Sequence, residues 1–213
     1  MDKKIFIGVG IVAICAVLLV CFLGGDGIFH SKTSFKTKFM DGEIQGNAFK
    51  EPDLISDILQ DYRVDYSDHS NNVFYTFGVV KNASFSYKTW EWFGAKKIHS
   101  YEVNGITWTI YYQDSKTISK YHNATTKLGG YLCVAYKDGI YYEIGISSDK
   151  IPSNSSIDSE LFKNYAKPLI ESVTLKNASK APYLYQWWGY SEGDFNMLVN
   201  DVNNNGFDYV YPK

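Results

Sequence analysis

The sequence has few of the residues and motifs that identify a catalytic or metal site. Two of its three cysteines lie in a long apolar run near the N-terminus, and only Cys133 lies outside that run. The rest of the chain therefore cannot form an internal disulfide, and its stability must come from a hydrophobic core. Cys133 has no adjacent histidine or basic residue to lower its pKa, so we interpret it as a packing residue.

Arginine is almost absent as well, because Arg63 is the only arginine among 21 basic residues. Its planar guanidinium group is the usual means of binding phosphate or carboxylate in a bidentate way, so this scarcity argues against such ligands. The formal net charge of −2 gives no electrostatic reason to expect nucleic acid as a partner. The four histidines include no H-E-x-x-H pair, and no P-loop, G-x-S-x-G or G-x-G-x-x-G motif follows a strand pattern. We predict no catalytic or cofactor-binding residue and lean towards a protein that is not an enzyme.

The most prominent positive feature is Ile5–Leu23, 19 consecutive residues without a charge. A helix of that length spans about 28 Å, enough to cross a bilayer. Lys3 and Lys4 precede it, which favours an inside N-terminus. We predict a single-pass transmembrane helix that contacts the lipid bilayer through residues 5–23, at the cell membrane, with the C-terminal domain extracytoplasmic. A cleaved signal peptide is the alternative, although its apolar core is usually about 7–15 residues, and either reading exports the same domain.

Changes in composition and period divide the remaining sequence. The predicted order is a cytoplasmic basic stub (1–4), a transmembrane helix or uncleaved signal anchor (5–23), a tether (24–33), an α+β extracytoplasmic domain (34–177), and an aromatic and Asn-rich C-terminal extension (178–213).

Two dipeptides, Asn104-Gly105 and Asp138-Gly139, predict tight β-hairpins because both readily adopt the positive φ values of type I′ turns. A two-residue turn fixes the residue pairs across the strands. The first hairpin would place His99 on the apolar face, so we interpret it as a buried, hydrogen-bonded histidine. The predicted strands are 98–103 with 106–112 and 131–137 with 140–148, and the predicted pairs include Tyr101 with Trp108, His99 with Ile110, and Cys133 with Ile144.

Helical periods occur over residues 51–62, 157–171 and 192–202. Asp158 or Ser159 can cap the second helix, and Pro168 should kink or interrupt it, which allows two short helical pieces. A strand over 35–39 with a turn at Asp41-Gly42, and a closing strand over 172–175 in the main sheet, complete the pattern. The predicted fold class is α+β: an antiparallel β-sheet of hairpins packed with a few helices, preceded by one N-terminal transmembrane helix.

Four N-x-S/T triplets lie outside the apolar run, and none has proline at its middle position. Each is a glycosylation candidate in an exported protein, although an Asn- and Ser-rich chain also produces such triplets by chance. The candidate acceptors are Asn82, Asn123, Asn154 and Asn177.

The segment from Asp201 to Asp208 resembles the first half of a calcium loop, with oxygen side chains at alternate positions and then a glycine. The position that needs a bidentate glutamate holds Pro212, so any calcium binding would be weak. A turn that ends the preceding helix is the alternative. The candidate ligands are Asp201, Asn203, Asn205 and Asp208.

The C-terminal extension begins with a cluster of aromatic residues. Exposed rings could bind sugars or a protein partner, whereas buried rings would fill a groove of the core. The candidate platform residues are Tyr183, Tyr185, Trp187, Trp188 and Tyr190.

The lysine-led anchor, the Asn- and Tyr-rich exterior, and the run from Gly139 to Ile144 before a helix resemble uncharacterised single-pass surface proteins of methanogenic archaea. From about Phe35 to Lys176 the order of elements is similar to the PsbP/Mog1-like α+β fold. The resemblance implies a binding or scaffold module and brings no family catalytic residues.

We therefore expect a membrane-anchored extracytoplasmic domain with a binding or structural role at the cell surface, whose partner is a surface protein or glycan. One alternative is a surface hydrolase acting on polysaccharide or cell-wall material, with carboxylates such as Asp65, Asp68 and Glu91 brought together by folding. The other is a weakly calcium-stabilised extracellular module.

Overall fold

The computed structural model describes residues 31–52, 61–81, 91, 94–116, 128–187 and 189–206. Contacts divide the chain into two units, Met1–Ser31 and Lys32–Lys213, and every element described below belongs to the second unit. The predicted transmembrane helix and most of the helix predicted over 51–62 lie outside the described residues. Within the described part, no helix combines the length and hydropathy needed to cross a bilayer.

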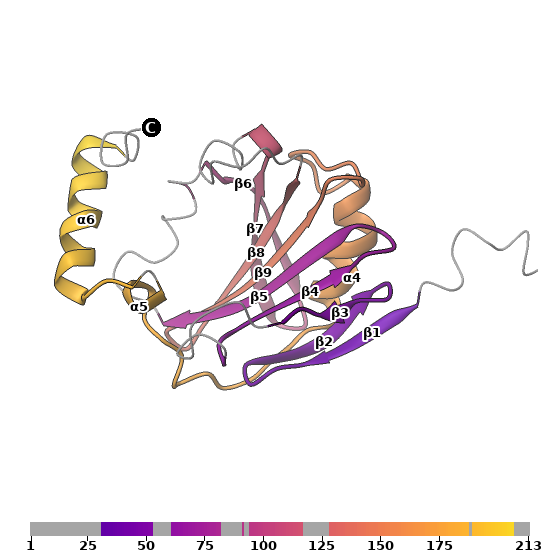
Figure 1. The fold of residues 1–213 in the computed structure, drawn as a ribbon, viewed down its shortest axis with the longest axis horizontal. Helices are drawn as coiled ribbons and strands as arrows, with labels where there is room; N and C mark the ends of the chain where they lie inside the picture. The colour runs from indigo at the N-terminus through magenta and orange to yellow at the C-terminus, as the bar shows by residue number, and fades with distance from the viewer. Residues whose placement is uncertain are drawn as a thin grey trace, which may run out of the picture. The chain divides into compact units, whose positions relative to one another are not determined.

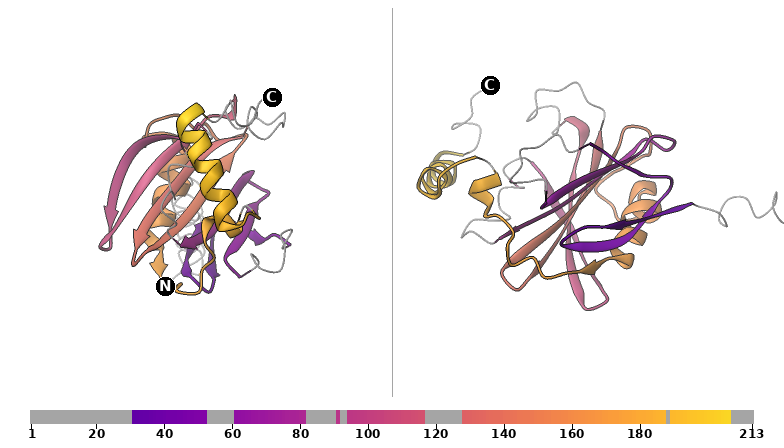
Figure 2. Two further views of the ribbon diagram at one scale, coloured as in Figure 1. Left: turned by 90° about the vertical axis from the view of Figure 1, so that its left-hand side faces the viewer. Right: turned by 60° about the horizontal axis from the view of Figure 1, so that its bottom comes forward.

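The second unit contains two antiparallel sheets and several short helices (Figure 1), which confirms the predicted α+β class. The small sheet has the order β1-β2-β10, and the large sheet has the order β3-β4-β5-β9-β8-β7-β6. Figure 2 shows the twist of the large sheet. The strands are β1 (Lys32–Lys36), β2 (Met40–Gln45), β3 (Phe49–Lys50), β4 (Arg63–Asp68), β5 (Val73–Lys81), β6 (Lys96–Val103), β7 (Ile106–Gln113), β8 (Gly129–Lys137), β9 (Ile140–Ser148) and β10 (Thr174–Leu175). The helices are the π-helical η1 (Phe162–Ala166), α4 (Lys167–Ser172), α5 (Leu184–Trp187) and α6 (Glu192–Asn205).

Both predicted hairpins are present with the predicted register. The turn residues have the positive φ values that the sequence requires, 53° and 71° at Asn104-Gly105 and 53° and 80° at Asp138-Gly139. Because each turn contains two residues, it fixes which residues pair across the two strands. The confirmed pairs include Tyr101 with Trp108, His99 with Ile110, and Cys133 with Ile144.

The prediction that His99 is buried is wrong, because its side chain is exposed. The register is correct, but β6 is the last strand of the large sheet, and most of its residues are exposed. The β6–β7 ladder also shifts between Lys97 and His99, an irregularity that is common at sheet edges. Pairing with an apolar residue of the neighbouring strand is therefore not enough to bury a residue on the edge strand.

The first turn and the last strand differ from the prediction. Asp41 and Gly42 lie within β2, and the chain turns instead at Thr37, whose hydroxyl donates to Met40 O at 2.7 Å and accepts from Met40 N at 2.8 Å. Gly42 is needed under the Phe35 ring, since a Cβ atom there would lie 2.8 Å from a ring carbon. β10 pairs with β2 and so closes the small sheet rather than the main one.

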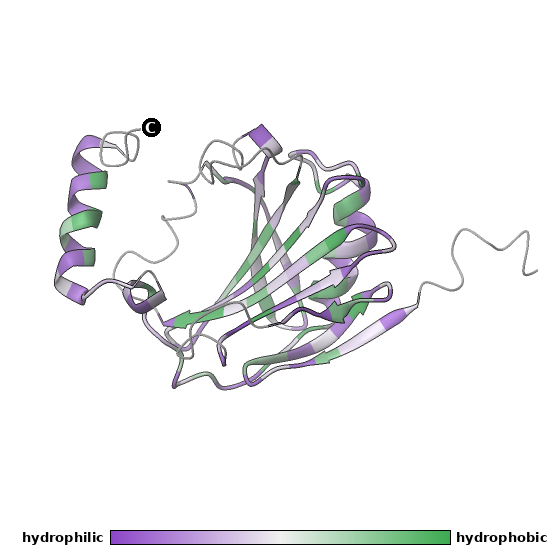
Figure 3. Cartoon of the chain, viewed as in Figure 1, coloured by the Kyte–Doolittle hydropathy of each residue, from purple (hydrophilic) through white to green (hydrophobic). Residues whose placement is uncertain are grey.

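The main core fills the space between one face of the large sheet and the layer formed by η1, α4 and the small sheet. Figure 3 marks apolar segments in the strands of the large sheet and in α4. Trp108, Phe77 and Phe162 are almost fully buried here. Cys133 is also fully buried, which raises the pKa of its thiol and confirms its role in packing.

The helix predicted over 157–171 forms later and in two pieces. Ser159 Oγ accepts from Phe162 N at 3.2 Å, as expected of a cap. Pro168 has no amide hydrogen, and the turn before it widens into η1 before α4 continues.

The opposite face of the large sheet carries a second, smaller hydrophobic cluster. Some of its residues lie on the strands, where they alternate with residues of the main core. Others come from the C-terminal helices. Its buried members are Val80, Ala95, Tyr111, Val134, Tyr141, Leu184, Phe195 and Val199.

Candidate functional site

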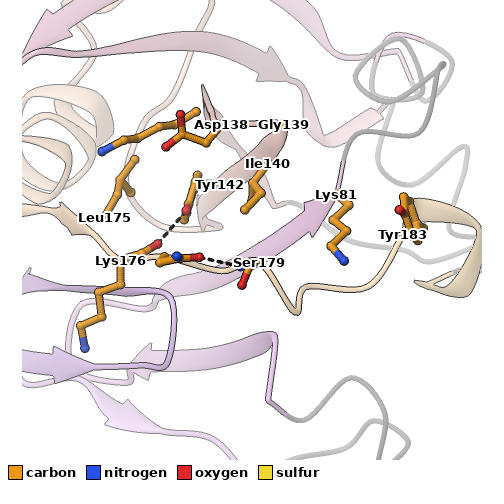
Figure 4. A pocket seen from close by; sticks show the side chains of 11 residues that line it. Lys81, Asp138, Gly139, Ile140, Tyr142, Leu175, Lys176, Ser179 and Tyr183 are labelled. Carbon is orange, nitrogen blue, oxygen red and sulfur yellow. Dashed lines mark hydrogen bonds between the residues drawn. The ribbon is translucent and has the colours of Figure 1, made fainter.

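A pocket of about 450 Å³ lies where the end of β5, the β8–β9 turn and the segment after β10 come together (Figure 4). This volume is within the range of small-molecule sites. The three segments are far apart in sequence, so no motif marks the pocket. Its polar lining comes from Lys81, Lys137, Asp138, Tyr142, Lys176, Asn177 and Ser179, and the Tyr183 ring forms one side.

Hydrogen bonds hold these segments in place. Lys81 N donates to Pro182 O at 2.8 Å, and Lys81 bridges to Tyr183 in the parallel direction. The Tyr142 hydroxyl donates to Lys176 O at 2.6 Å. Burial raises the pKa of Tyr142, and the nearby Asp138 carboxylate raises it further, so this hydroxyl keeps its proton and remains a donor. The segment after β10 is therefore held against the large sheet by bonds from β5 and β9.

The lysines of the pocket differ in their partners. Lys176 Nζ lies 2.6 Å from Asp41 Oδ1 and also donates to Thr37 O at 2.8 Å, so its charge is compensated. Lys81 and Lys137 form no ion pair within the described part of the chain. Lys81 Nζ lies instead 5.1 Å from the centre of the Tyr183 ring, within cation–π range. Lys81 and Lys137, which have no ion pair within the described part of the chain, and Asp138 therefore belong to the lining of one pocket.

The five aromatic candidates do not form one platform. Tyr183 lines the pocket and is 40% exposed, and Tyr185 stacks on it with the ring centroids 5.5 Å apart. Tyr190 is exposed beside Phe195 of α6, and Trp187 packs against the second cluster. Trp188 lies outside the described residues. Among the four candidates that the structure describes, only Tyr183 lines the pocket.

Two of the glycosylation candidates can be examined in the structure, because Asn82 and Asn123 lie outside the described residues. Asn154 and Asn177 are both exposed. In each, Oδ1 accepts a hydrogen bond from the backbone amide two residues later, at 2.8 Å from Ser156 and 2.9 Å from Ser179. Asn177 also lines the pocket, a coincidence that the sequence does not reveal.

Three of the calcium candidates are helical. Asp201, Asn203 and Asn205 belong to the last turns of α6, which ends at Gly206 with a φ of 85°. Helical spacing places Asn203 on the side opposite to Asp201 and Asn205. The fourth candidate, Asp208, lies outside the described residues, so the calcium site stays a prediction. The described residues contain no group of three His, Cys, Asp or Glu side chains that could hold a metal ion.

The carboxylates considered for a hydrolase do not converge. Asp65 and Asp68 are three positions apart on β4 and therefore point to opposite faces of the sheet. Asp65 pairs with Arg63 at 3.2 Å, whereas Asp68 accepts from the backbone amide of Ser70 at 3.0 Å. Glu91 is exposed and does not belong to a described strand. Asp65 and Asp68 therefore have local structural partners.

A Ser–His–Glu cluster that the sequence analysis missed lies beside β3 and β4. Ser67 Oγ lies 3.1 Å from His69 Nε2 and is hydrogen-bonded to the Glu51 carboxylate. The Glu51 carboxylate also approaches His69 Nε2, at 3.6 Å. A catalytic triad needs the acid on the other ring nitrogen, where it orients the base. Ser67 is also buried. The cluster therefore lacks the geometry of an activated nucleophile.

A second feature that the sequence did not reveal is the buried Glu143 on β9. Burial raises its pKa from 4.5 to about 8, with the Arg63 guanidinium acting in the opposite direction. The buried Nε1 atom of Trp187 has no hydrogen-bond partner within the described part of the chain. Glu143 faces the second cluster, where α5 covers it.

No protein-family model matches this sequence, and no curated protein matches it significantly. Among solved structures, it is similar to a crystal structure from Bacteroides thetaiotaomicron and to the solution structure of cyanobacterial PsbP from Synechocystis. Both matches have a TM-score of 0.42 and cover 71% of this chain, with identities of 11% and 10%. They cover 50% of the Bacteroides chain and 96% of PsbP, so this protein spans half the length of the first.

One of the two neighbours is thus a PsbP protein, and the PsbP/Mog1-like resemblance noted from the sequence stays a prediction. A TM-score below 0.5 does not establish a common fold, and neither neighbour brings a function to this chain. The resemblance to archaeal surface proteins stays a prediction.

Proposed function

We propose that this protein is a membrane-tethered extracytoplasmic binding module and that the pocket beside Tyr183 is its ligand site. The apolar run Ile5–Leu23 after two lysines supports the tether and the orientation. The observation that carries the ligand site is the lining of the pocket, which includes the exposed Tyr183 and two lysines, Lys81 and Lys137, without an ion pair in the described part of the chain.

The chemistry of the lining favours an acidic sugar unit of a surface polysaccharide. A carboxylate on the sugar would bind between Lys81 and Lys137, because opposite charges attract strongly in a partly enclosed site. Sugar hydroxyls would donate to Asp138 and accept from the amide of Asn177. The Tyr183 ring offers apolar area to the face of the sugar. An acidic segment of a surface protein is the competing ligand.

Binding of oligogalacturonide to the full chain in detergent micelles, measured by calorimetry, tests this proposal. Its neutral analogue, in which each carboxylate is reduced to an alcohol, is the matched ligand control. We expect binding of the acidic form only, and a loss of about tenfold or more in Lys81→Ala and in Lys137→Ala, equivalent to about 1.4 kcal/mol.

Lys97→Ala is the control variant, because Lys97 is exposed on β6 and does not line the pocket. Affinity should also fall with added salt, since the attraction is electrostatic. Equal binding of the acidic and neutral ligands, or unchanged affinity in both pocket variants, would contradict the proposal. Binding of an acidic peptide in place of the sugar would assign the site to a protein partner.

A further inference from the structure

Asn177 is at once a wall residue of the pocket and the acceptor residue of an N-x-S triplet, Asn177-Ala178-Ser179. We infer that N-glycosylation of Asn177 closes this pocket, so that the modified and unmodified forms of the protein differ in access to Lys81 and Lys137. The consequence for ligand binding rests on the proposed function, whereas the closure itself depends only on geometry.

The Asn177 side chain is presented for modification. It is exposed, and its Oδ1 is engaged by Ser179 N at 2.9 Å. Because Oδ1 makes the bond to the backbone, that bond does not use Nδ2, the atom that receives the sugar. Ser179, the third residue of the triplet, lines the same pocket. The acceptor triplet and the ligand site therefore occupy one surface.

The backbone around Asn177 is fixed, so a glycan there cannot swing away with a moving loop. On one side, Lys176 N donates to Phe39 O at 2.9 Å and Lys176 O accepts from the Tyr142 hydroxyl at 2.6 Å. On the other side, Ala178 is buried and its carbonyl accepts from Ala181 N at 2.8 Å. The first sugar would therefore start at the wall of a pocket of about 450 Å³, with the remaining sugars over its mouth.

The modification requires a lipid-linked oligosaccharide as donor and a membrane transferase as catalyst, both on the side to which the domain is exported. Asn177 Nδ2 forms a bond to the anomeric carbon of the first sugar. The bond from that carbon to the lipid phosphate oxygen breaks, the lipid phosphate leaves with the electron pair, and one amide proton passes to a base of the transferase. The amide Oδ1 keeps its bond to Ser179 N, so the local turn survives.

Asn154 provides an internal control. It is exposed, belongs to an N-x-S triplet, and has the same side-chain bond, from Ser156 N at 2.8 Å. Its carbonyl accepts from the Tyr131 hydroxyl at 2.7 Å, near the end of the β8–β9 hairpin that lies away from the turn. The pocket lies at the turn end, about six residues or roughly 20 Å along β8. A glycan on Asn154 therefore leaves the pocket open.

The test uses the full chain from membranes of a host that N-glycosylates exported proteins, as wild type, Asn177→Gln and Asn154→Gln. Peptide mass spectrometry gives the occupancy of each acceptor. Acetylation by an N-hydroxysuccinimide ester then measures access to Lys81 and Lys137, with the exposed Lys97 as the reference. We expect acetylation of both pocket lysines to be several-fold slower in the form modified at Asn177, restored in Asn177→Gln, and unaffected by Asn154→Gln.

An unmodified Asn177 in wild-type protein, or equal acetylation with and without its glycan, would overturn the inference. If Asn177→Gln does not fold, Ser179→Ala removes the acceptor signal while keeping the amide of Asn177. Oligogalacturonide binding separates the two proposals. Protected lysines in the modified form, together with no binding to Asn177→Gln, would support closure and refute the ligand.

Discussion

Glu143 and Trp187 meet above the backbone of Gly78. A Cβ atom on that glycine would lie 3.7 Å from Glu143 Oε2 and 3.0 Å from Trp187 Cη2. Gly78 is directly opposite Glu143 across the β5–β9 ladder, so the absence of a side chain is what lets the indole approach the sheet. The C-terminal segment thus covers a buried carboxyl group on the fourth strand of a seven-stranded sheet.

This arrangement predicts a pH-dependent stability. The pKa of Glu143 is about 8 in the folded protein and 4.5 as its ordinary value. Between these values the folded state keeps a proton that the unfolded state releases, so the free energy of unfolding falls as pH rises from about 4.5 to 8. Glu143→Gln should remove this loss and stabilise the protein at pH 8 relative to wild type, with about 5 kcal/mol as an upper bound.

Urea unfolding of the full chain in detergent micelles at pH 4.5 and pH 8 measures the effect. Glu102→Gln is the matched control, because Glu102 is exposed on β6. A parallel pH dependence in wild type and Glu143→Gln would show that this carboxyl group does not titrate in the interval.

Gly78→Ala should destabilise the protein by about 1–3 kcal/mol, because the new methyl group forces the Trp187 ring away from the sheet. Gly145→Ala is the control on the neighbouring strand. A Cβ atom there meets only ordinary contacts at 3.5 Å or more, so the change should be neutral or stabilising by about 0.4–1 kcal/mol. Unfolding midpoints, with Trp fluorescence as the probe, distinguish the two, and equal effects would contradict the contact.

Calcium should not raise the melting temperature. Asp201, Asn203 and Asn205 are helical, and a helix does not direct alternate side chains to one ion. Thermal unfolding of the full chain with and without about 1 mM Ca²⁺ checks this, at the affinity expected of a weak extracellular site. A rise that disappears in Asp201→Ala would show that the end of α6 unwinds to form the loop that the sequence pattern suggested.

The topology is tested by adding protease to intact cells. If Ile5–Leu23 crosses the bilayer with its lysines inside, residues from Asp26 onward should be digested without lysis. Antibodies to the C-terminus then detect no full-length chain, while an internal control protein stays whole. Digestion that requires lysis would place the domain on the inner side and remove the surface role.

The features that the sequence predicted well are those fixed by adjacent residues. Asn104-Gly105 and Asp138-Gly139 each determine a turn and hence the register of two strands. Pro168 changes the helix locally, because its missing amide hydrogen leaves the preceding turn to widen into η1, although the helix continues through it in α4. The Asp41-Gly42 turn failed for a tertiary reason, since Gly42 is required under the Phe35 ring.

The pocket could not be predicted because it depends on residues brought together by folding. Lys81 ends β5, Lys137 begins a turn, and Asn177 follows the last strand, so only the paired sheets bring them together. The burial of Glu143 could not be predicted for a related reason. The alternation of side chains along β9 places Glu143 on the face opposite the main core, where a glutamate is normally exposed to solvent. Its burial depends on Trp187, which lies in a later segment.

If the proposed tether holds, the exposed strand β6 has a consequence for many copies on one membrane. A tethered chain meets its neighbours at high local density, and an open strand invites backbone pairing between copies. Lys96 and Lys97 place like charges at the start of that strand, and the shift in register before His99 breaks its straight run of amides. Both features disfavour backbone pairing between the sheets of neighbouring molecules. A high local density alone should therefore not cause these molecules to form fibres.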